Sequence, residues 1–239
     1  MRNRPNQTIQ IEPIGIMHSP FGEKFGTPRQ SGLIETAVGE IELFPPFNDP
    51  RRLHGLDGFS HIWITFQFDR CVDQGWQARV RPPRLGGNTE VGVFASRAPF
   101  RPNHLGLSVV RLIEILKAPL RLRVSGVDLV DATPVIDIKP YLPYADSKPD
   151  ARGGFAAQAP ESRLAVMFSA AAEQALGELP DGDAVRQLIA EVIALDPRPA
   201  YRCGVEPGRR YGMHLGDCEV AWRVLPDGAE VTAIQPVSN

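Results

Sequence analysis

The sequence lacks the motifs of the common metal, nucleotide and hydrolase sites. It has three cysteines, Cys71, Cys203 and Cys218; no pair has metal-ligand spacing, and the odd count does not indicate a disulfide framework. No dinucleotide fingerprint follows a predicted strand, and Walker A, HExxH and GxSxG motifs are missing. The glycine-rich run at residues 84–88 is followed by no helical pattern, so it predicts a turn. We therefore expect no metal site and no helix-bound phosphate.

Strong net charge and long apolar runs are also missing. The 239-residue chain has a formal net charge of −2, so a nucleic-acid partner would have to bind a local basic patch. No run is apolar enough to cross a bilayer, and Met1 to Gln10 hold no signal-peptide core. Together with the few cysteines, these features predict a cytoplasmic protein without a membrane partner.

What the sequence does contain, before Pro143, is a series of short strands separated by proline and glycine. In the clearest one, His61–Phe68, isoleucine and phenylalanine alternate with other residues, which is the period of a half-buried strand. Many short strands with little helical period are typical of a barrel or a sandwich. The other predicted strands lie within Ile9–Ser19, Gly39–Phe44, Glu90–Ala95, Leu107–Leu116, Arg121–Val127 and Pro134–Ile138.

A polar stretch rich in proline, glycine and alanine, Pro143–Pro160, predicts a linker or domain boundary. The pattern then changes to a strand, two helices and a hairpin around Pro226-Asp227-Gly228. The sequence thus predicts a mainly β protein, with a β domain over residues 1–150 and a small α+β domain over residues 160–239. The elements predicted after the linker are Leu164–Phe168, Ala170–Leu179, Asp183–Leu195, Cys218–Leu225 and Glu230–Ile234.

Two early stretches combine turn residues with polar side chains. Lys24–Gly32 (KFGTPRQSG) is either a plain exposed loop or a loop that holds a small polar ligand. Gly58–Trp63 places His61 at the start of a predicted strand, beside Ser60. His61 either completes the strand end or lines a pocket at the mouth of the barrel.

A third stretch, Phe94–Leu107 (FASRAPFRPNHLGL), is stiffened by prolines and rich in hydrogen-bond donors. Five arginines lie between residues 79 and 101 against one acid, Glu90, which makes a local basic patch. Arginine binds phosphate and carboxylate through paired hydrogen bonds, so the patch suits an anionic ligand as well as a solvated surface. The arginines are Arg79, Arg81, Arg84, Arg97 and Arg101.

The last two stretches carry acids and arginines. In Val127–Tyr141 we expect Asp137 to pair with Lys139, whereas Asp131, in a turn-like Asp-Ala-Thr-Pro, is placed to reach a ligand. Asp196–Arg202 (DPRPAYR), followed by Arg209-Arg210-Tyr211, interleaves arginine with tyrosine. Such residues offer phosphate contacts and stacking faces, although a surface loop after a helix has the same composition.

In this order, the five stretches resemble the bacterial TsaA-like family, also called TrmO. The resemblance covers nearly the whole chain, including DPRPAYR. It implies a single-sheet β-barrel, a homodimer, and S-adenosylmethionine as donor for N6-methylation of threonylcarbamoyladenosine at position 37 of tRNA. It also implies a donor site formed by Pro28, Arg29, Gln30, Ser60, His61, Arg97, Leu107, Asp131, Ala132, Thr133 and Pro134.

The chain departs from the family pattern at two places. Ala132 stands where glycine is common, and His104 stands where proline is common. If the backbone at residue 132 needs a positive φ, the added Cβ bears on a backbone contact there.

The expected chemistry is in-line methyl transfer, in which the protein mainly aligns donor and acceptor. Asp131 is the first candidate and His61 the second for taking the proton from N6, and positioning alone is the alternative. We expect tRNA contacts from Arg84, Arg101, Arg198, Tyr201, Arg202, Arg209 and Arg210.

Two other functions fit the same residues: a non-catalytic barrel that senses adenine nucleotides or binds RNA, and a methyltransferase for a small acceptor. The arginine-rich loops favour nucleic acid over a small acceptor.

Overall fold

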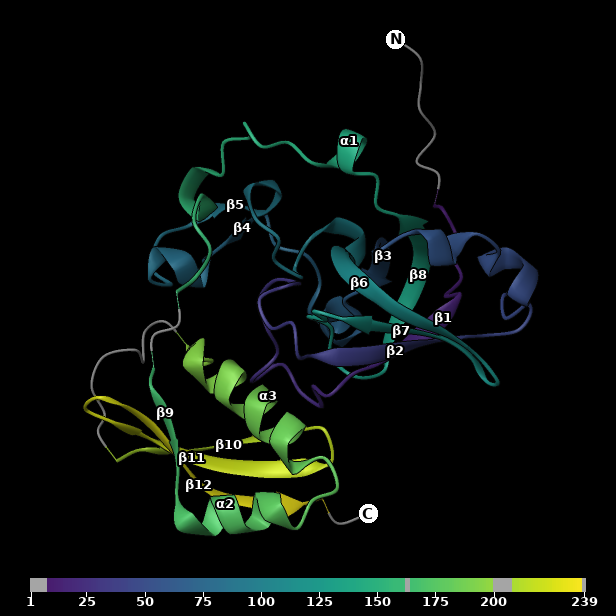
Figure 1. The fold of residues 1–239 in the computed structure, drawn as a ribbon. Helices are drawn as coiled ribbons and strands as arrows, with labels where there is room; N and C mark the ends of the chain where they lie inside the picture. Colours follow the sequence, from purple (N-terminus) through teal and green to yellow (C-terminus); the bar gives the residue numbers. More distant parts are fainter. Residues whose placement is uncertain (1–7, 162–163, 200–207, 238–239) are drawn as a thin grey trace.

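The computed structural model describes residues 8–161, 164–199 and 208–237, and its first half is a closed barrel (Figure 1). The strand order is β1-β2-β7-β6-β3-β8, with all neighbours antiparallel. Closure leaves no free sheet edge, and inward residues such as Ile62, Ile64 and Val110 fill the interior. The bounds are β1 Gly15–His18, β2 Val38–Leu43, β3 His61–Gln67, β6 Leu105–Lys117, β7 Leu120–Ser125 and β8 Thr133–Pro140.

A long excursion, residues 68–104, joins β3 to β6 and carries a small hairpin. The predicted strand Glu90–Ala95 is only two residues long in the structure, because a 3₁₀ turn follows it at once. At residues 84–88 the chain forms a 3₁₀ turn and two left-handed glycines, as predicted. The elements are η3 Asp69–Gln74, β4 Arg79–Val80, η4 Pro83–Leu85, β5 Val91–Gly92, η5 Val93–Ala95 and η6 Pro102–His104; η1 Pro50–Leu53 and η2 Leu56–Gly58 precede β3.

The predicted linker is a largely irregular arm with two short helical turns. These are α1 (Pro143–Asp146) and the 3₁₀ turn η7 (Gly154–Ala156). The η7 turn contacts η4 of the excursion, so the arm crosses the barrel domain before it reaches the second unit. Figure 1 shows this path along the upper edge of the molecule.

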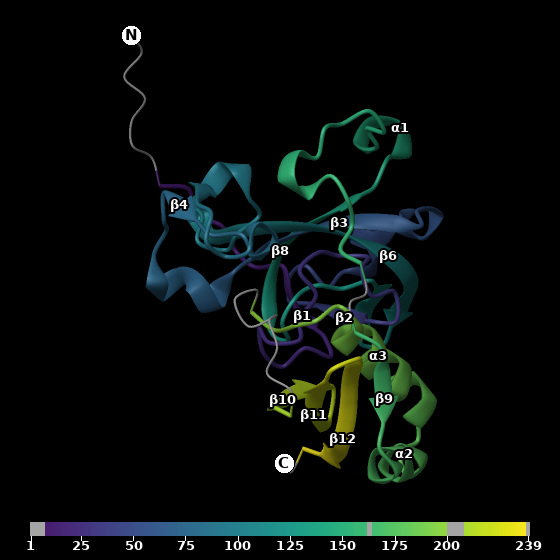
Figure 2. The same ribbon diagram turned by 90° about the vertical axis from the view of Figure 1, so that its left-hand side faces the viewer.

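The C-terminal unit, residues 164–237, is an α+β layer pair below the barrel (Figures 1 and 2). Its four-stranded sheet has the order β10-β11-β12-β9, and α2 packs against β12 while α3 packs against β9. The predicted helices and hairpin are present, but β10 was not predicted. The bounds are β9 Val166–Phe168, α2 Ala170–Gly177, α3 Gly182–Ala194, β10 Arg210–Leu215, β11 Cys218–Leu225 and β12 Gly228–Pro236.

One continuous apolar core runs through both units. It joins barrel residues such as Met17 and Phe21 to Ile189, Met213 and Trp222 of the C-terminal unit. An isolated antiparallel bridge also pairs Phe21 with Leu215. The two units are therefore packed together, and the division at residues 150–160 stays a prediction. No helix among the described residues is long and apolar enough to cross a membrane.

Candidate functional site

The loop between β1 and β2 brings the predicted Thr27–Gln30 motif to the basic excursion. The side-chain oxygen of Gln30 accepts a short hydrogen bond from Nη1 of Arg97, 67 residues further along the chain. Pro28 is buried, whereas Arg97 is exposed. The structure thus brings together two of the predicted donor-site segments and leaves the guanidinium of Arg97 open to a ligand.

Asp128 is close enough to Arg97 for the arginine's charge to lower its pKa. The sequence analysis did not select this residue. Its Oδ1 is fully buried and has no hydrogen-bond partner among the residues that the structure describes. Burial raises the pKa of Asp128 to about 6, against the lowering effects of Ser108, of backbone groups at Ser31 and Asp128, and of the charge on Arg97. The sequence signal that could have identified it is an acid between two apolar residues, Val127 and Leu129, both of which are buried in the structure.

The turn at residues 131–134 is held mainly by contacts within the fold. Oδ1 of Asp131 accepts from the backbone N–H of Ser19 at 2.9 Å, and its carbonyl oxygen accepts from Arg70 at 2.9 Å. The hydroxyl of Thr133 donates to the carbonyl of Val130 at 2.6 Å. The carboxylate of Asp131 therefore stabilises the turn, which weakens its case as a proton acceptor.

Both departures from the family pattern occur at left-handed residues. Ala132 has φ of 62° and His104 has φ of 50°. Glycine takes such a conformation without strain, and proline cannot take it at all. His104 is held there by a 3.0 Å hydrogen bond between Nδ1 and the carbonyl oxygen of Pro99.

The structure separates Ser60 and His61 from the other predicted donor residues. His61 begins β3 opposite Arg111, whereas Leu107 pairs with Thr65, four residues further along β3. At the rise of an extended strand this is about 13 Å. Within one chain, the strand register thus places His61 nearer the opposite barrel end from Leu107, and its membership of the donor site stays a prediction.

His61 has its own polar and aromatic surroundings at that end. Ser60 Oγ lies 2.9 Å from His61 Nδ1, and the ring of Tyr141 meets the imidazole edge-on at 6.3 Å. Nearby, the indole N–H of Trp63 donates to Asp146 at 2.9 Å. On β8, Asp137 forms the predicted ion pair with Lys139.

Several arginines of the basic patch already have partners. Arg79 and Arg81 flank Glu90 at 3.7 and 2.6 Å, and Arg101 donates to the carbonyl of Ser96 at 3.0 Å. Arg84 lies on the surface of the excursion. Arg79 and Arg81 therefore share one acid, while Arg101 keeps its charge and is held by a backbone group.

The C-terminal arginines divide into buried and exposed ones. Arg198 is only 4% exposed and forms a two-point ion pair with Asp196, at 2.7 and 2.8 Å. A direct phosphate contact from Arg198, as predicted, does not agree with this burial. Arg209 and Arg210 are exposed, with Arg209 over the ring of Tyr211 at 5.6 Å. The predicted contacts Tyr201 and Arg202 lie outside the described residues.

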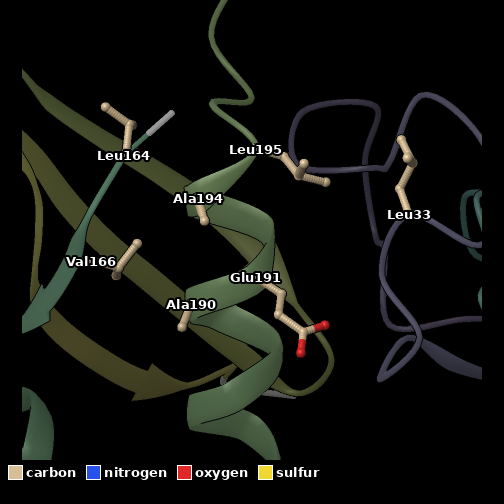
Figure 3. Close-up of a pocket in the computed structure, with 7 residues that line it drawn as sticks. All are labelled: Leu33, Leu164, Val166, Ala190, Glu191, Ala194 and Leu195. Atoms are coloured by element: carbon tan, nitrogen blue, oxygen red, sulfur yellow. The ribbon is translucent and has the colours of Figure 1, made fainter. Parts of the chain in front are cut away.

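A shallow apolar pocket of about 300 Å³ lies between the C-terminal unit and the β1–β2 loop. Figure 3 shows Leu33 of that loop facing Glu191 of α3 and Leu195, which directly follows α3. The carboxylate of Glu191 accepts from the hydroxyl of Thr36 at 2.6 Å. The pocket is part of the contact between the units, and neither Arg97 nor Asp128 lines it.

The structure is a closed β-barrel with arginine-bearing loops and a packed α+β unit. Family models match both parts: the tRNA-methyltransferase O N-terminal domain over residues 16–147, and the TrmO C-terminal domain over residues 161–237. The chain belongs to the tRNA-methyltransferase O family.

Individual relatives agree with this assignment. The chain is 48% identical to the tRNA (adenine(37)-N6)-methyltransferase of Escherichia coli, over 96% of this chain and 99% of that one. It is 50% identical, over 90% and 92% of the two chains, to a Pseudomonas aeruginosa protein whose name places it provisionally among the S-adenosylmethionine-dependent methyltransferases. A crystal structure of TrmO from Pseudomonas aeruginosa superposes with a TM-score of 0.79 at 40% identity, covering 96% and 99% of the chains.

Proposed function

We propose that this chain methylates N6 of adenine 37 in tRNA with S-adenosylmethionine, and that the adenine carries a threonylcarbamoyl group. The observation that carries the proposal is the cluster of Gln30, Arg97 and Asp128, which combines a cation with an acid whose buried Oδ1 has no hydrogen-bond partner among the described residues. The names of the most similar relatives support the tRNA adenine and the methyl donor.

The cluster suits the charges of the proposed donor. S-adenosylmethionine has an amino-acid carboxylate, an ammonium group and the sulfonium whose methyl it supplies. The exposed guanidinium of Arg97 would bind a carboxylate, and the buried Oδ1 of Asp128 needs a donor or a cation. Gln30 would hold Arg97 in place. Among the predicted donor residues, Pro28, Arg29, Leu107 and the turn at 131–134 would complete the site.

The N6 proton has no committed acceptor in this proposal. Asp131 is engaged with Ser19, and His61 lies at the far end of β3. Alignment of donor and acceptor would then provide most of the rate enhancement. The carboxylate of the substrate's own threonyl group is a further acceptor within reach of the modified base.

Selectivity for the threonylcarbamoyl group would come from the arginines. Its carboxylate can accept two parallel hydrogen bonds from a guanidinium, whereas plain adenine leaves those donors unpaired at a cost of about 1–3 kcal/mol each. A site built to bond a polar group rejects the analogue that lacks it.

The test uses labelled S-adenosylmethionine and two tRNAs of one sequence, with and without threonylcarbamoyladenosine. We expect label only in the modified tRNA, at adenine 37 by nucleoside mass analysis. Equal labelling of both would contradict the selectivity. Donor binding without any labelling would favour the non-catalytic barrel, and bound ATP in its place would favour a nucleotide sensor.

We propose that tRNA contacts the exposed arginines Arg84, Arg209 and Arg210 together with Arg101, and also Tyr201 and Arg202. Support comes from the exposure of the first three and from the stacking of Arg209 on Tyr211. A tRNA substrate also makes the cytoplasm the expected compartment.

We further propose a homodimer in which the two barrel ends meet across the partners. Large apolar side chains stand exposed, with Phe94, Leu107 and Ile113 at 79, 53 and 48%. A partner would cover them and could bring its Ser60 and His61 to the Arg97 end. Analytical sedimentation gives the mass of the assembly. Mixing Arg97→Ala chains with His61→Ala chains should restore activity only if each donor site combines Arg97 of one chain with His61 of its partner.

A further inference from the structure

The loop segment Pro20–Thr36, which carries Pro28–Gln30, lies between the barrel and the C-terminal unit. Figures 1 and 2 show the C-terminal unit under the barrel in both views, and Figure 3 shows α3 facing this loop. On the barrel side, the backbone N–H of Gly32 donates to the carbonyl of Gly126 at 2.9 Å. The other side of the segment contacts the C-terminal unit along most of its length.

The first half of the segment is joined to β10 and the turn after it. Phe21 bridges Leu215, and the N–H of Gly216 donates to the carbonyl of Pro20 at 2.7 Å. The ring of Phe25 stacks on Tyr211 at 6.3 Å, and Tyr211 stacks in turn on the buried Trp222 at 4.8 Å. These contacts fix where the loop enters the site.

The second half meets the segment that follows α3. Nη2 of Arg29 donates to the carbonyl oxygen of Arg198 at 3.3 Å. That carbonyl belongs to a residue whose side chain is fixed by the two-point ion pair with Asp196, and both residues are about 95% buried (exposures of 4 and 5%). Asp196 itself adopts a left-handed φ of 52°. A backbone acceptor is therefore held rigidly beneath a predicted donor-site residue.

The contact continues into the site through the next residue. Gln30 follows Arg29 and holds Arg97 through its amide oxygen. A shift of the loop at Arg29 would therefore move the acceptor that orients Arg97. A binding group whose own position is fixed loses less conformational freedom when the ligand binds, so the ligand binds more tightly.

We infer that the buried Asp196–Arg198 pair is a positioning element of the methyl-donor site, and that the C-terminal unit preorganises donor binding as well as contacting tRNA. The inference rests on the proposed function, since it names a determinant of the donor site. Neither Asp196 nor Arg198 touches the donor in this account; they act through Arg29. A role restricted to tRNA would leave donor affinity independent of this pair.

The experiment measures binding of S-adenosylhomocysteine and, separately, of tRNA by the full chain carrying Asp196→Asn. Asparagine accepts a left-handed φ, so the substitution removes the charge with little backbone strain. We expect the donor-analogue Kd to rise about fivefold or more, with tRNA Kd and the cooperativity of unfolding little changed. Donor-analogue affinity equal to that of the unchanged protein would overturn the inference.

A matched control separates positioning from loosened docking. Thr36→Val removes another hydrogen bond between the units, to Glu191, without touching residues 28–30. It should leave the donor-analogue Kd within twofold. An equal rise in both variants would show that any weakening of the contact suffices, and would overturn the specific role of the pair.

A double-mutant cycle tests the route through Arg29. In an Arg29→Gln background, Asp196→Asn should cause little further loss of donor affinity, because the shared contact is already gone. Additive losses would contradict the route. If Asp196→Asn does not fold, Arg198→Lys is measured under the same criteria. Absence of donor binding by the unchanged protein would refute the proposed function instead.

Discussion

Arg97 shows how a single exposed side chain can matter more for binding than for stability. It is oriented by Gln30, and its charge acts to lower the pKa of Asp128 against the larger effect of burial. A ligand carboxylate would therefore find the guanidinium already oriented. Little of the fold depends on this side chain, because it packs on the surface of a loop.

We predict that Arg97→Ala lowers donor affinity at least tenfold and changes the free energy of unfolding by within about 0.5 kcal/mol. Isothermal titration with S-adenosylhomocysteine and denaturant unfolding measure the two quantities. Arg97→Lys is the control, because it keeps the charge but loses the planar pair of donors. Its donor affinity should lie between that of the unchanged protein and that of Arg97→Ala. Unchanged affinity in Arg97→Ala would remove Arg97 from the site.

Asp128 should make stability depend on pH. Its folded-state pKa of about 6 lies above the ordinary value of 3.8, so the protonated form stabilises the fold below pH 3.8, and this contribution is lost as pH rises through 6. Asp128→Asn removes the titration. Its free energy of unfolding, relative to the unchanged protein, should therefore rise by about 2 kcal/mol between pH 4.5 and 7.5.

Urea unfolding at several pH values checks this prediction. A pH-independent difference between Asp128→Asn and the unchanged protein would contradict the raised pKa.

The residue scale is also where the sequence predicted least. The acids Asp128 and Asp131 are three positions apart, and only the structure shows that Asp131 accepts from Ser19 while Asp128 faces Arg97. Likewise, nothing in the sequence DPRPAYR distinguishes Arg198 from Arg202, but in the structure Arg198 is buried against Asp196. Composition and spacing define residue types, whereas a residue's role depends on partners from distant elements.

At the scale of elements, prediction succeeded where the hydrophobic period was clean. β3 alternates buried and half-buried residues over its whole length, and α3 lies within one residue of its predicted bounds. β10 was missed because Arg209-Arg210 marks its start as a polar loop, although Met213 and Leu215 alternate inward. The separation of His61 from Leu107 could not be predicted, because it depends on strand register, which the sequence does not reveal.

The turn before β8 contains a strained residue that can be relieved. Ala132 has φ of 62°, a conformation that costs a residue with a Cβ about 1–2 kcal/mol. Ala132→Gly removes that cost but raises the entropy of the unfolded chain, which costs about 0.4–1 kcal/mol, so we predict a net stabilisation of up to about 1.6 kcal/mol. Thermal unfolding measures it. Ala151→Gly, at an exposed loop residue without positive φ, should be neutral or destabilising.

An equal loss of stability in Ala132→Gly and Ala151→Gly would contradict the strain at residue 132.

At the scale of the whole molecule, the two sheets were predictable and their packing was not. The change from strand patterns to helix patterns after Pro160 predicts a second unit. The shared core between Phe21, Met213 and Ile189 gives no signal in either part alone, since each residue is simply apolar. The consequence is functional: the C-terminal unit supports the loop that carries Pro28–Gln30 in addition to presenting arginines.

The last prediction separates these two roles of the C-terminal unit by their dependence on salt. With a formal net charge of −2, the molecule can attract tRNA only through local arginines, and each phosphate contact releases counterions. Replacing Arg209 and Arg210 together by alanine should weaken tRNA binding and make the slope of log K against log salt shallower by about 1.4–1.8. Donor affinity should stay unchanged, because both arginines are exposed at or just before the start of β10, on the surface proposed to contact tRNA. Arg186→Ala is the control: it lies in the same unit, but its charge is balanced by Glu173 at 3.1 Å, so the slope should not change. Fluorescence titration with tRNA at salt concentrations from about 50 to about 200 mM measures the slopes. An unchanged slope in the double variant would exclude these two arginines from the tRNA footprint and leave donor-loop positioning as the role of this unit.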